Sequence, residues 1–543
     1  MFNVNSYLLT YLLTYAQIFY IESLLTQQFI ALFFTSFIIT SLIKDNLFKR
    51  LLFVSKLSHI KFKEYFMKRI LFIALSFMFL FACKGPQNNG DNHANKAEEF
   101  TVNFNVKDNT GGTLTAKIKD GKELTSGDRV SENVEVVFTA TPKNSTFDVE
   151  SWTLDGASVL DADLQKGKTE YTLKITKDVD VVVRFKNSLE GFVIISLNGK
   201  NIEGKDPSYE MPSKKPEWNG CFIANRTVKL SDYAMAKNIV TYELWYETYV
   251  WAKDNGYTFK NEGREGNDGV DGEAPTAKKK HPVTFVNWRD TIVWCNAHTQ
   301  KTKGEAFCVY RDKNNHDLVL KNATEETQCD EAFIDIEKTG FRLPTEAEWE
   351  FAARFQGDGS KEEHKQNAES YGEGIYLTLA NSASGAKKPV GFSGVVINGV
   401  KVAENDYVKW EELRAEVARV GIFGCWFCGD KSYIDQDPPI TGTAEVATKE
   451  PNYLGLYDMN GNVWEWLSDG DDGNISDVTI HDNLYKENDI VVNPLGKPNS
   501  NEKCRRGASW FFDSEQLTVA LRELNVANHI FGDQGFRLAC SVR

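Results

Sequence analysis

The sequence predicts a mixed α+β protein in which a small all-β domain precedes a larger α+β domain. Residues 100–185 alternate apolar and polar side chains with the period of two that strands have, whereas several segments after residue 189 repeat apolar residues at helical spacing. The 543 residues are 42% hydrophobic and 25% charged, a composition typical of chains that bury sizeable cores.

The first 98 residues predict export and anchoring rather than a folded core. Residues 67–83, MKRILFIALSFMFLFAC, place two positive residues before a short apolar run and a small residue before Cys83. This pattern indicates a lipoprotein signal peptide with Cys83 as the lipidated residue; a short membrane helix is the alternative. Residues 84–98 form a polar, flexible tether. We therefore expect a lipid-anchored membrane protein of the cell envelope, exposed to the periplasm or the cell surface.

Residues 1–66 contain two further apolar runs ahead of this signal. Because a lipoprotein signal belongs at the N-terminus, Met67 is the expected start and the upstream stretch a doubtful extension; a two-helix membrane hairpin is the alternative.

The charge balance argues against nucleic-acid binding. The net charge is −14, while residues 1–66 carry six Lys/Arg against three Asp/Glu and Lys68 and Arg69 add two positive charges, so the chain from Cys83 onward carries −19. Such a chain repels phosphate backbones, and we expect no nucleic-acid partner.

Residues 99–187 predict a small antiparallel β domain with one buried face. Gly, Asn, Asp and Lys separate the alternating runs FTVNFNV, TLTAKI, VEVVFTATP, FDVESWTLDG, YTLKI and VDVVVRF. The domain resembles the internalin-type repeat domains that follow the lipid anchor in many bacterial surface proteins. We interpret it as a spacer, with ligand binding as the alternative.

Residues 188–543 predict the larger domain. Helices are expected within 241–256, 286–300 and 343–355, the last starting at a capping box formed by Thr345 and Glu348. An insertion at about 356–450 contains one further expected helix, DYVKWEELRAEVARV.

Four blocks occur in order within this domain: HPVTFVNWRDTIVWCN, GFRLPTEAEWEFAAR, YLGLYDMNGNVWEWLSD, and RRGASW followed by GFRLACSVR. Together they resemble the formylglycine-generating enzyme (sulfatase-modifying factor) family, whose fold is an elaborated C-type lectin-like domain. Their tryptophans and the arginines of the two GFRL phrases, Arg342 and Arg537, are interpreted as scaffold, since large rings bury apolar area and a guanidinium ties loops together.

The resemblance implies a structural calcium ion at DMNGNVWEW. Asp458 and Glu465 would supply carboxylate oxygens and Gly461 and Val463 backbone carbonyls, a set of hard ligands suited to calcium. An acidic turn bonded only to backbone amides is the alternative.

The resemblance fails at the catalytic cysteines. Family enzymes bind copper through two cysteines just after a GGS(Y/W) phrase, because thiolates select Cu(I). Here the phrase is GASW, and the two cysteine positions fall on Phe512 and Leu517. We therefore expect no copper and no catalytic residue. Cys425 and Cys428 form a lone CxxC in the insertion, interpreted as a disulfide or two free thiols, with a relocated redox pair as the alternative.

The segment between GASW and the final GFRL resembles the ligand-displaying segment of a non-catalytic branch of the family, the variable proteins. Hypervariability stays a hypothesis, since one sequence cannot show it. The candidate binding residues are Trp510, Phe511, Phe512, Asp513, Glu515, Gln516, Arg522, Glu523, Asn525, Asn528, His529, Phe531 and Asp533. If they face solvent, aromatic rings beside acids make a recognition patch; Phe512 and Leu517 filling the former copper site is the alternative.

The leading functional prediction is a catalytically inactive envelope lipoprotein that binds an unknown protein or glycan ligand. The alternatives are a formylglycine-generating oxidoreductase that modifies a cysteine of sulfatases and a purely structural envelope protein.

Overall fold

The computed structural model describes residues 98–542, apart from 145, 159–166, 207–217, 219, 388–395, 398–399, 402–414, 425–440, 471–489, 497–498 and 513. The proposed signal peptide, Cys83, the tether, residues 1–66, Asp513 and the Cys425–Cys428 pair lie outside the described residues. By the contacts within each part, the chain divides into two units, residues 1–96 and residues Ala97–Arg543.

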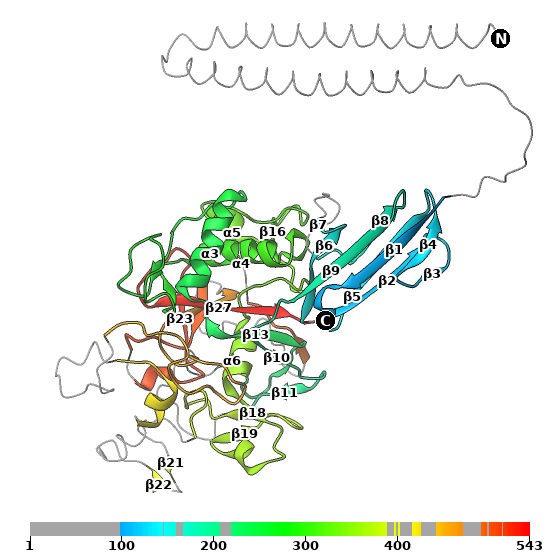
Figure 1. The fold of residues 1–543 in the computed structure, drawn as a ribbon. Coiled ribbons are helices and arrows are strands. Elements are labelled where there is room, and N and C mark those ends of the chain that lie inside the picture. Colours follow the sequence, from blue (N-terminus) through cyan, green and yellow to red (C-terminus); the bar gives the residue numbers. More distant parts are fainter. Residues whose placement is uncertain are drawn as a thin grey trace, which may run out of the picture. The chain divides into compact units, whose positions relative to one another are not determined.

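Residues 98–187 form two sheets (Figure 1), one ordered β4-β1-β9-β6-β7 and the other β3-β2-β5-β8. Their strands are β1 (Glu99–Val106), β2 (Gly112–Ile118), β3 (Glu123–Leu124), β4 (Asp128–Ser131), β5 (Glu135–Pro142), β6 (Phe147–Leu154), β7 (Ala157–Ser158), β8 (Glu170–Lys174) and β9 (Val179–Asn187). Each of the six alternating runs in the sequence contains one of these strands.

The alternation in these strands corresponds to burial on one face. Val102 in β1, Phe138 in β5 and Val181 in β9 are fully buried in one shared core, whereas their sequence neighbours reach outward. The sequence predicts antiparallel pairing throughout this domain. That prediction is wrong for β1 and β9, which run parallel, with Val102 opposite Val179. Alternation fixes which side chains are buried but carries no information on strand direction.

The larger domain is built on a six-stranded sheet ordered β10-β13-β27-β23-β25-β26. Its strands are β10 (Phe192–Ile195), β13 (Tyr233–Ile239), β23 (Trp464–Gly470), β25 (Glu502–Arg506), β26 (Arg522–Val526) and β27 (Gln534–Ser541). The final GFRL phrase lies in β27, which pairs antiparallel with β13 and parallel with β23. The last family block therefore occupies the middle of the sheet.

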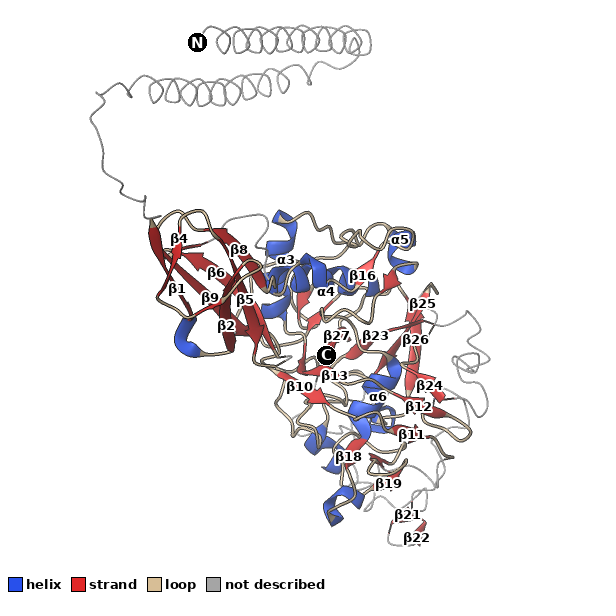
Figure 2. Ribbon diagram, turned by 90° about the vertical axis from the view of Figure 1, so that its right-hand side faces the viewer, coloured by secondary structure: helices blue, strands red, loops and turns tan. Residues whose placement is uncertain are grey.

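Helices cover both faces of this sheet (Figures 1 and 2): α3 (Tyr242–Asp254) and α4 (Trp288–Thr302) lie on one side and α6 (Glu346–Arg354) on the other. Two consecutive residues of β23 pack against helices on opposite faces of the sheet. Trp466 packs into the core below α3 and α4, and Leu467 packs into the core that contains Trp349 of α6. Both faces of the central strands are buried because helices cover both faces of the sheet.

Three helices lie where the sequence predicts them. Asn287 caps α4 and Thr345 caps α6, each with a complete capping box, and Thr241 caps α3. At the start of α6 the Thr345 side chain accepts a hydrogen bond from the Glu348 amide, and the Glu348 carboxylate accepts one from the Thr345 amide, which satisfies two donors. Of the helix predicted at 406–420, residues 415–420 are described and are helical.

Short elements complete the domain. They are α5 (Glu326–Asp330), β11 (Asn201–Glu203), β12 (Thr227–Lys229), β14 (Arg264–Glu265), β15 (Val283–Thr284), β16 (Tyr310–Arg311), β17 (Phe333–Ile334), β18 (Phe355–Gly357), β19 (Ala368–Ser370), β20 (Tyr376–Thr378), β21 (Val396–Ile397), β22 (Val400–Lys401) and β24 (Ile490–Val492). The mixed α+β class is confirmed. Among the described residues, no helix combines the length and apolar character needed to cross a bilayer.

Candidate functional site

The positions that resemble the family's copper-binding cysteines lie in an apolar cluster. Phe512 packs edge-to-face against Trp464 with ring centroids 5.4 Å apart, and Leu517 is 1% exposed. Val420 and Phe423, which lie within the insertion, belong to the same cluster. A phenyl ring and an isobutyl group offer no ligand to Cu(I). The copper centre of the family therefore does not fit these residues.

The cysteines that the structure describes offer no substitute. All six, Cys221, Cys295, Cys308, Cys329, Cys504 and Cys540, are buried and free. Burial raises the pKa of each thiol, to about 12 for Cys308 and Cys329. Because the thiolate is the reactive and metal-binding form, these groups are structural.

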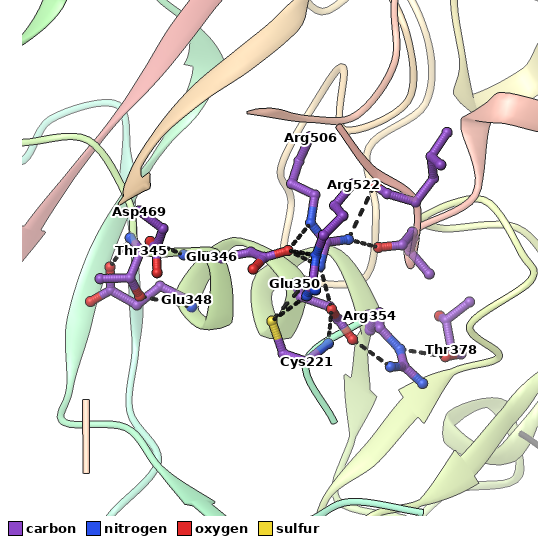
Figure 3. A network of polar contacts seen from close by, with 12 residues as sticks. Cys221, Thr345, Glu346, Glu348, Glu350, Arg354, Thr378, Asp469, Arg506 and Arg522 are labelled. Carbon is purple, nitrogen blue, oxygen red and sulfur yellow. Dashed lines mark hydrogen bonds and ion pairs between the residues drawn. The ribbon is translucent and has the colours of Figure 1, made fainter. Parts of the chain in front are cut away.

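A buried polar network joins α6 to β25 and β26 (Figure 3). Arg506 lies between Glu346 and Glu350, at 2.7 and 2.6 Å, and is itself fully buried. Glu350 also binds Arg354 at 2.7 Å, and the Cys221 amide donates to it at 2.7 Å. Burial alone would raise the pKa of Glu350, but Arg506 and Arg354 offset this and hold its pKa below the ordinary value. The network is closed to ligands and fixes α6 to the sheet.

Arg522 belongs to this network and not to a binding surface. Its guanidinium lies 2.6 Å from Glu346, and its side chain is 3% exposed. Three further candidate binding residues also turn inward. Trp510 is 8% exposed, Phe512 packs into the apolar cluster, and the Asp533 carboxylate, which burial gives a raised pKa, accepts a hydrogen bond from Ser509 at 2.8 Å. Trp510, Arg522 and Asp533 are buried and Phe512 is half-buried, so these four residues do not form a solvent-facing patch, and the packing of Phe512 is that of the alternative in which it fills the former copper site.

Other residues of the segment do reach the surface. Val526, Ile530 and Phe531 are 36%, 41% and 45% exposed, and Asn528 is exposed between them. Half-buried Phe511 meets Phe531 edge-on, with centroids 6.1 Å apart. We call Val526, Ile530, Phe531 and Phe511 the C-terminal patch. Val526 was not among the candidates, because its position at the end of β26 is visible only in the fold.

The remaining candidates surround this patch or the core beside it. His529 stacks on Phe531 at 6.3 Å, and burial lowers its pKa to about 4. Glu523 is paired with Arg505, and Asn525 accepts a hydrogen bond from the Val526 amide. Gln516 is half-buried, and the side chain of Glu515 lies outside the described residues.

The loop that resembles the calcium site is rigid and acidic. Gly461 has a φ of +78°, and a Cβ there would collide with the Ile422 carbonyl, so only glycine fits. Val463 is fully buried. Glu465 is fully buried and receives hydrogen bonds from Arg537 at 2.8 Å and from Trp349 at 2.8 Å. These contacts anchor one of the two candidate carboxylates.

Asp458 supplies the second candidate carboxylate, and only one of its two oxygens has a hydrogen-bond partner. Its Oδ2 accepts a hydrogen bond from the Ala447 amide at 2.8 Å, while Oδ1 is buried without a hydrogen-bond partner. Burial raises its pKa to about 6, and the charge of Glu465 adds to this shift. A buried carboxylate oxygen with a free lone pair beside a second carboxylate fits a hard cation. Among the described residues, no group of three or more His, Cys, Asp or Glu side chains forms a metal cluster, so backbone oxygens would have to complete the shell.

A family model and several known proteins are similar to this chain. The model of the sulfatase-modifying factor enzyme 1-like domain matches residues 184–401 and 416–542. The chaperone protein LppX of Paenibacillus barcinonensis is 28% identical over 249 residues, which are 45% of this chain and 66% of that protein. The formylglycine-generating enzyme of Bos taurus is 31% identical over 101 residues, which are 18% of this chain and 24% of that enzyme. The chain thus matches a quarter of the bovine enzyme's length.

Two solved structures are also similar. CarF is 20% identical, with a TM-score of 0.38, and the match covers 65% of this chain and 98% of CarF. Treponema denticola variable protein 1 is 22% identical, with a TM-score of 0.36, and the match covers 64% of this chain and 99% of that protein. Since the family model matches more than half of the sequence, the chain belongs to the sulfatase-modifying factor enzyme 1-like family.

Proposed function

We propose that the protein is a lipid-anchored envelope protein whose sulfatase-modifying factor-like domain, with a C-type lectin-like fold, binds a partner and does not form formylglycine. One observation carries this proposal: Phe512 and Leu517 pack as apolar core where the family's enzymes place copper ligands. Oxidation of a substrate cysteine at copper requires thiolate ligands, and the described cysteines are buried with raised pKa values.

The C-terminal patch is the proposed contact surface. Exposed Phe531, Ile530 and Val526 supply apolar area, which drives association when it is desolvated, and exposed Asn528 supplies polar contacts. A relative with 28% identity is named a chaperone protein, which supports a protein partner. The proposed envelope location makes that partner an exported protein. Residues 99–187 act as the internalin-type spacer between anchor and binding domain.

A calcium ion is proposed as a structural cofactor. Asp458, Glu465 and the carbonyls of Gly461 and Val463 would hold it, and the ion would neutralise the buried Asp458 charge. The ion would stabilise the loop that joins β23 to the insertion and would take no part in chemistry.

Site-specific crosslinking tests the contact surface. Full-length protein carrying p-benzoylphenylalanine in place of Phe531 is irradiated in the producing cells, with the same residue in place of Phe333 as control, since Phe333 is 37% exposed on β17. We expect an exported protein crosslinked from position 531 only.

The crosslinked protein is then purified, and its affinity for the full chain is measured. Phe531→Ala should weaken binding at least about tenfold, as truncation of an aromatic hot spot does, while Phe333→Ala should not. Identical adducts from both positions, or equal affinity of both variants, would overturn the proposed surface.

A further inference from the structure

A polar cavity of about 260 Å³ lies beside the C-terminal segment but outside the patch. Its walls come from the loop 265–281 and from residues 441–444. The side chains that line it include Glu265, Asn267, Asp268, Lys278, His281 and Thr443. The volume is smaller than that of sites for drug-sized ligands and suits one small ring.

The walls of this cavity are held in place by specific contacts. The Asn267 amide oxygen accepts a hydrogen bond from the Thr443 amide at 2.9 Å, and His281 Nδ1 lies 3.0 Å from the Thr443 hydroxyl. Gly266 has a φ of +64°, and a Cβ there would meet Thr443 and His281. The backbone approach that joins the two walls therefore requires glycine at position 266.

The walls offer both hydrogen-bond donors and acceptors. His281 Nδ1 is paired with Thr443, and among the described residues no partner is recorded for His281 Nε2. Burial lowers the pKa of His281, so at neutral pH its ring is uncharged. Asp268 and Lys278 are 72% and 59% exposed and lie 4.0 Å apart. Asp268 Oδ1 accepts a hydrogen bond from the Asn267 side-chain amide at 2.7 Å, which leaves Asp268 Oδ2 and the Lys278 ammonium group as the groups for a ligand.

The lining carries charges of both signs. Glu265 and Asp268 are carboxylates and Lys278 is an ammonium group, so a phosphate, a carboxylate or an ammonium ligand would each meet at least one like charge. Glu265 is already satisfied, because it accepts hydrogen bonds from the amide and the hydroxyl of Thr276. A neutral ligand whose groups both donate and accept, as hydroxyls do, matches this arrangement.

The loop that carries Asn267 packs against the C-terminal segment. A Cβ at Gly532 would lie 3.1 Å from Asn267 and 3.3 Å from the Phe285 ring, so position 532 lies close to both. Phe285 has a φ of +54°, a conformation that bulky residues rarely adopt, and Arg264 stacks on its ring at 3.9 Å. Backbone strain of this kind is retained where the surrounding structure holds it in place.

From these contacts we propose that the cavity binds one neutral sugar residue of a glycan, whose hydroxyls meet Asp268, Lys278 and His281. This is a second site, distinct from the C-terminal patch that the proposed function assigns to a protein partner.

Saturation-transfer NMR and calorimetry on the full-length protein test the site. The probes are neutral hexoses and N-acetylhexosamines, free and as trisaccharides, with inorganic phosphate and lysine methyl ester as ionic probes. We expect saturable binding of at least one neutral sugar and no competition by either ionic probe.

Three variants locate that binding. Asp268→Ala should weaken the sugar at least about tenfold, which is the loss of one hydrogen bond to a charged group. Thr441→Trp, which fills the cavity from an exposed position in its lining, should abolish binding. Val270→Ala, 64% exposed in the same loop and outside the lining, should bind like the unchanged protein.

The proposal is overturned when no neutral sugar binds below about 10 mM, or when binding persists in Thr441→Trp. Displacement of the sugar by phosphate or by lysine methyl ester also overturns it, since the site would then select charge. Phe531→Ala separates the two surfaces, because it should reduce partner binding and leave the sugar affinity unchanged.

Discussion

At the scale of single residues, the direction in which a side chain points decides whether it binds or supports. Arg522, Trp510 and Asp533 stand in a segment whose motif frame is typical of ligand display, yet all three are buried. The GASW and GFRL motifs show where the segment lies along the chain. Whether one of its side chains points inward or outward depends on the elements that pack against it, such as α6 against Arg522. Tryptophan burial, by contrast, follows from size and apolarity, so the scaffold role of Trp288 and Trp349 was predictable.

Arg522→Ala tests the supporting role. The change removes one of two cations from the buried Glu346 carboxylate, and we expect a loss of about 3 kcal/mol in the free energy of unfolding, measured by urea denaturation. Arg129→Ala, at an exposed position of β4, should change it by less than about 0.5 kcal/mol. An Arg522→Ala protein of unchanged stability would contradict the assignment to the network.

Asp458 predicts a dependence on pH and calcium. Its folded-state pKa of about 6 lies above the unfolded value, so the folded state binds more protons and, without metal, stability falls as pH rises through about 4 to 6. In EDTA at pH 7, Asp458→Asn should therefore be more stable than the unchanged protein by about 2 kcal/mol, and the gap should close near pH 4.

Added calcium should reverse that order. It should raise the urea midpoint of the unchanged protein and of the control Asp317→Asn, an exposed position, and leave Asp458→Asn unaffected. Equal responses to calcium in all three proteins would rule out Asp458 as a ligand.

At the scale of elements, helices and strands were predicted correctly where the sequence carries a clear capping or spacing pattern. The capping box at Thr345 and helical spacing placed α6, helical spacing alone placed α3, and alternation placed six of the strands of residues 98–187. The parallel pairing of β1 with β9 and the one-turn helix α5 were not predictable, since both depend on packing against distant elements. The two-residue strands of the larger domain were not predictable for the same reason, because they depend on packing against distant elements.

The capping box of α6 carries a measurable share of stability. Thr345→Ala removes the acceptor for the Glu348 amide at the start of a buried helix, and we expect a loss of about 1 to 2 kcal/mol in the free energy of unfolding. Thr345→Ser keeps the hydroxyl and should recover most of this loss. Equal losses in both variants would place the effect in packing of the methyl group and not in the cap.

At the scale of the whole molecule, the proposal joins an anchor, a spacer and a binding domain. The family assignment was predictable because four motif blocks keep their order over most of the larger domain. The ligand was not, because a family shares its scaffold while binding residues lie on the surface that the scaffold displays.

Anchoring through Cys83 predicts the location of the protein. Cys83→Ser should abolish incorporation of labelled palmitate and move the protein from the membrane fraction to the soluble fraction, since acyl chains hold by burying methylene groups in the bilayer. Cys540→Ser, at a buried cysteine of β27, is the matched control and should keep both label and location. Retention of label in Cys83→Ser would place the lipid elsewhere.

The central claim is that this family member binds without oxidising. An aerobic assay tests it most directly: full-length protein, copper and a sulfatase-type cysteine peptide are incubated, and formylglycine is followed by mass, with an active family enzyme as the positive control. We predict no product from the folded protein, because Phe512 and Leu517 stand where the copper ligands would be. Turnover that disappears in Cys425→Ser would contradict the claim and place an active site in the insertion.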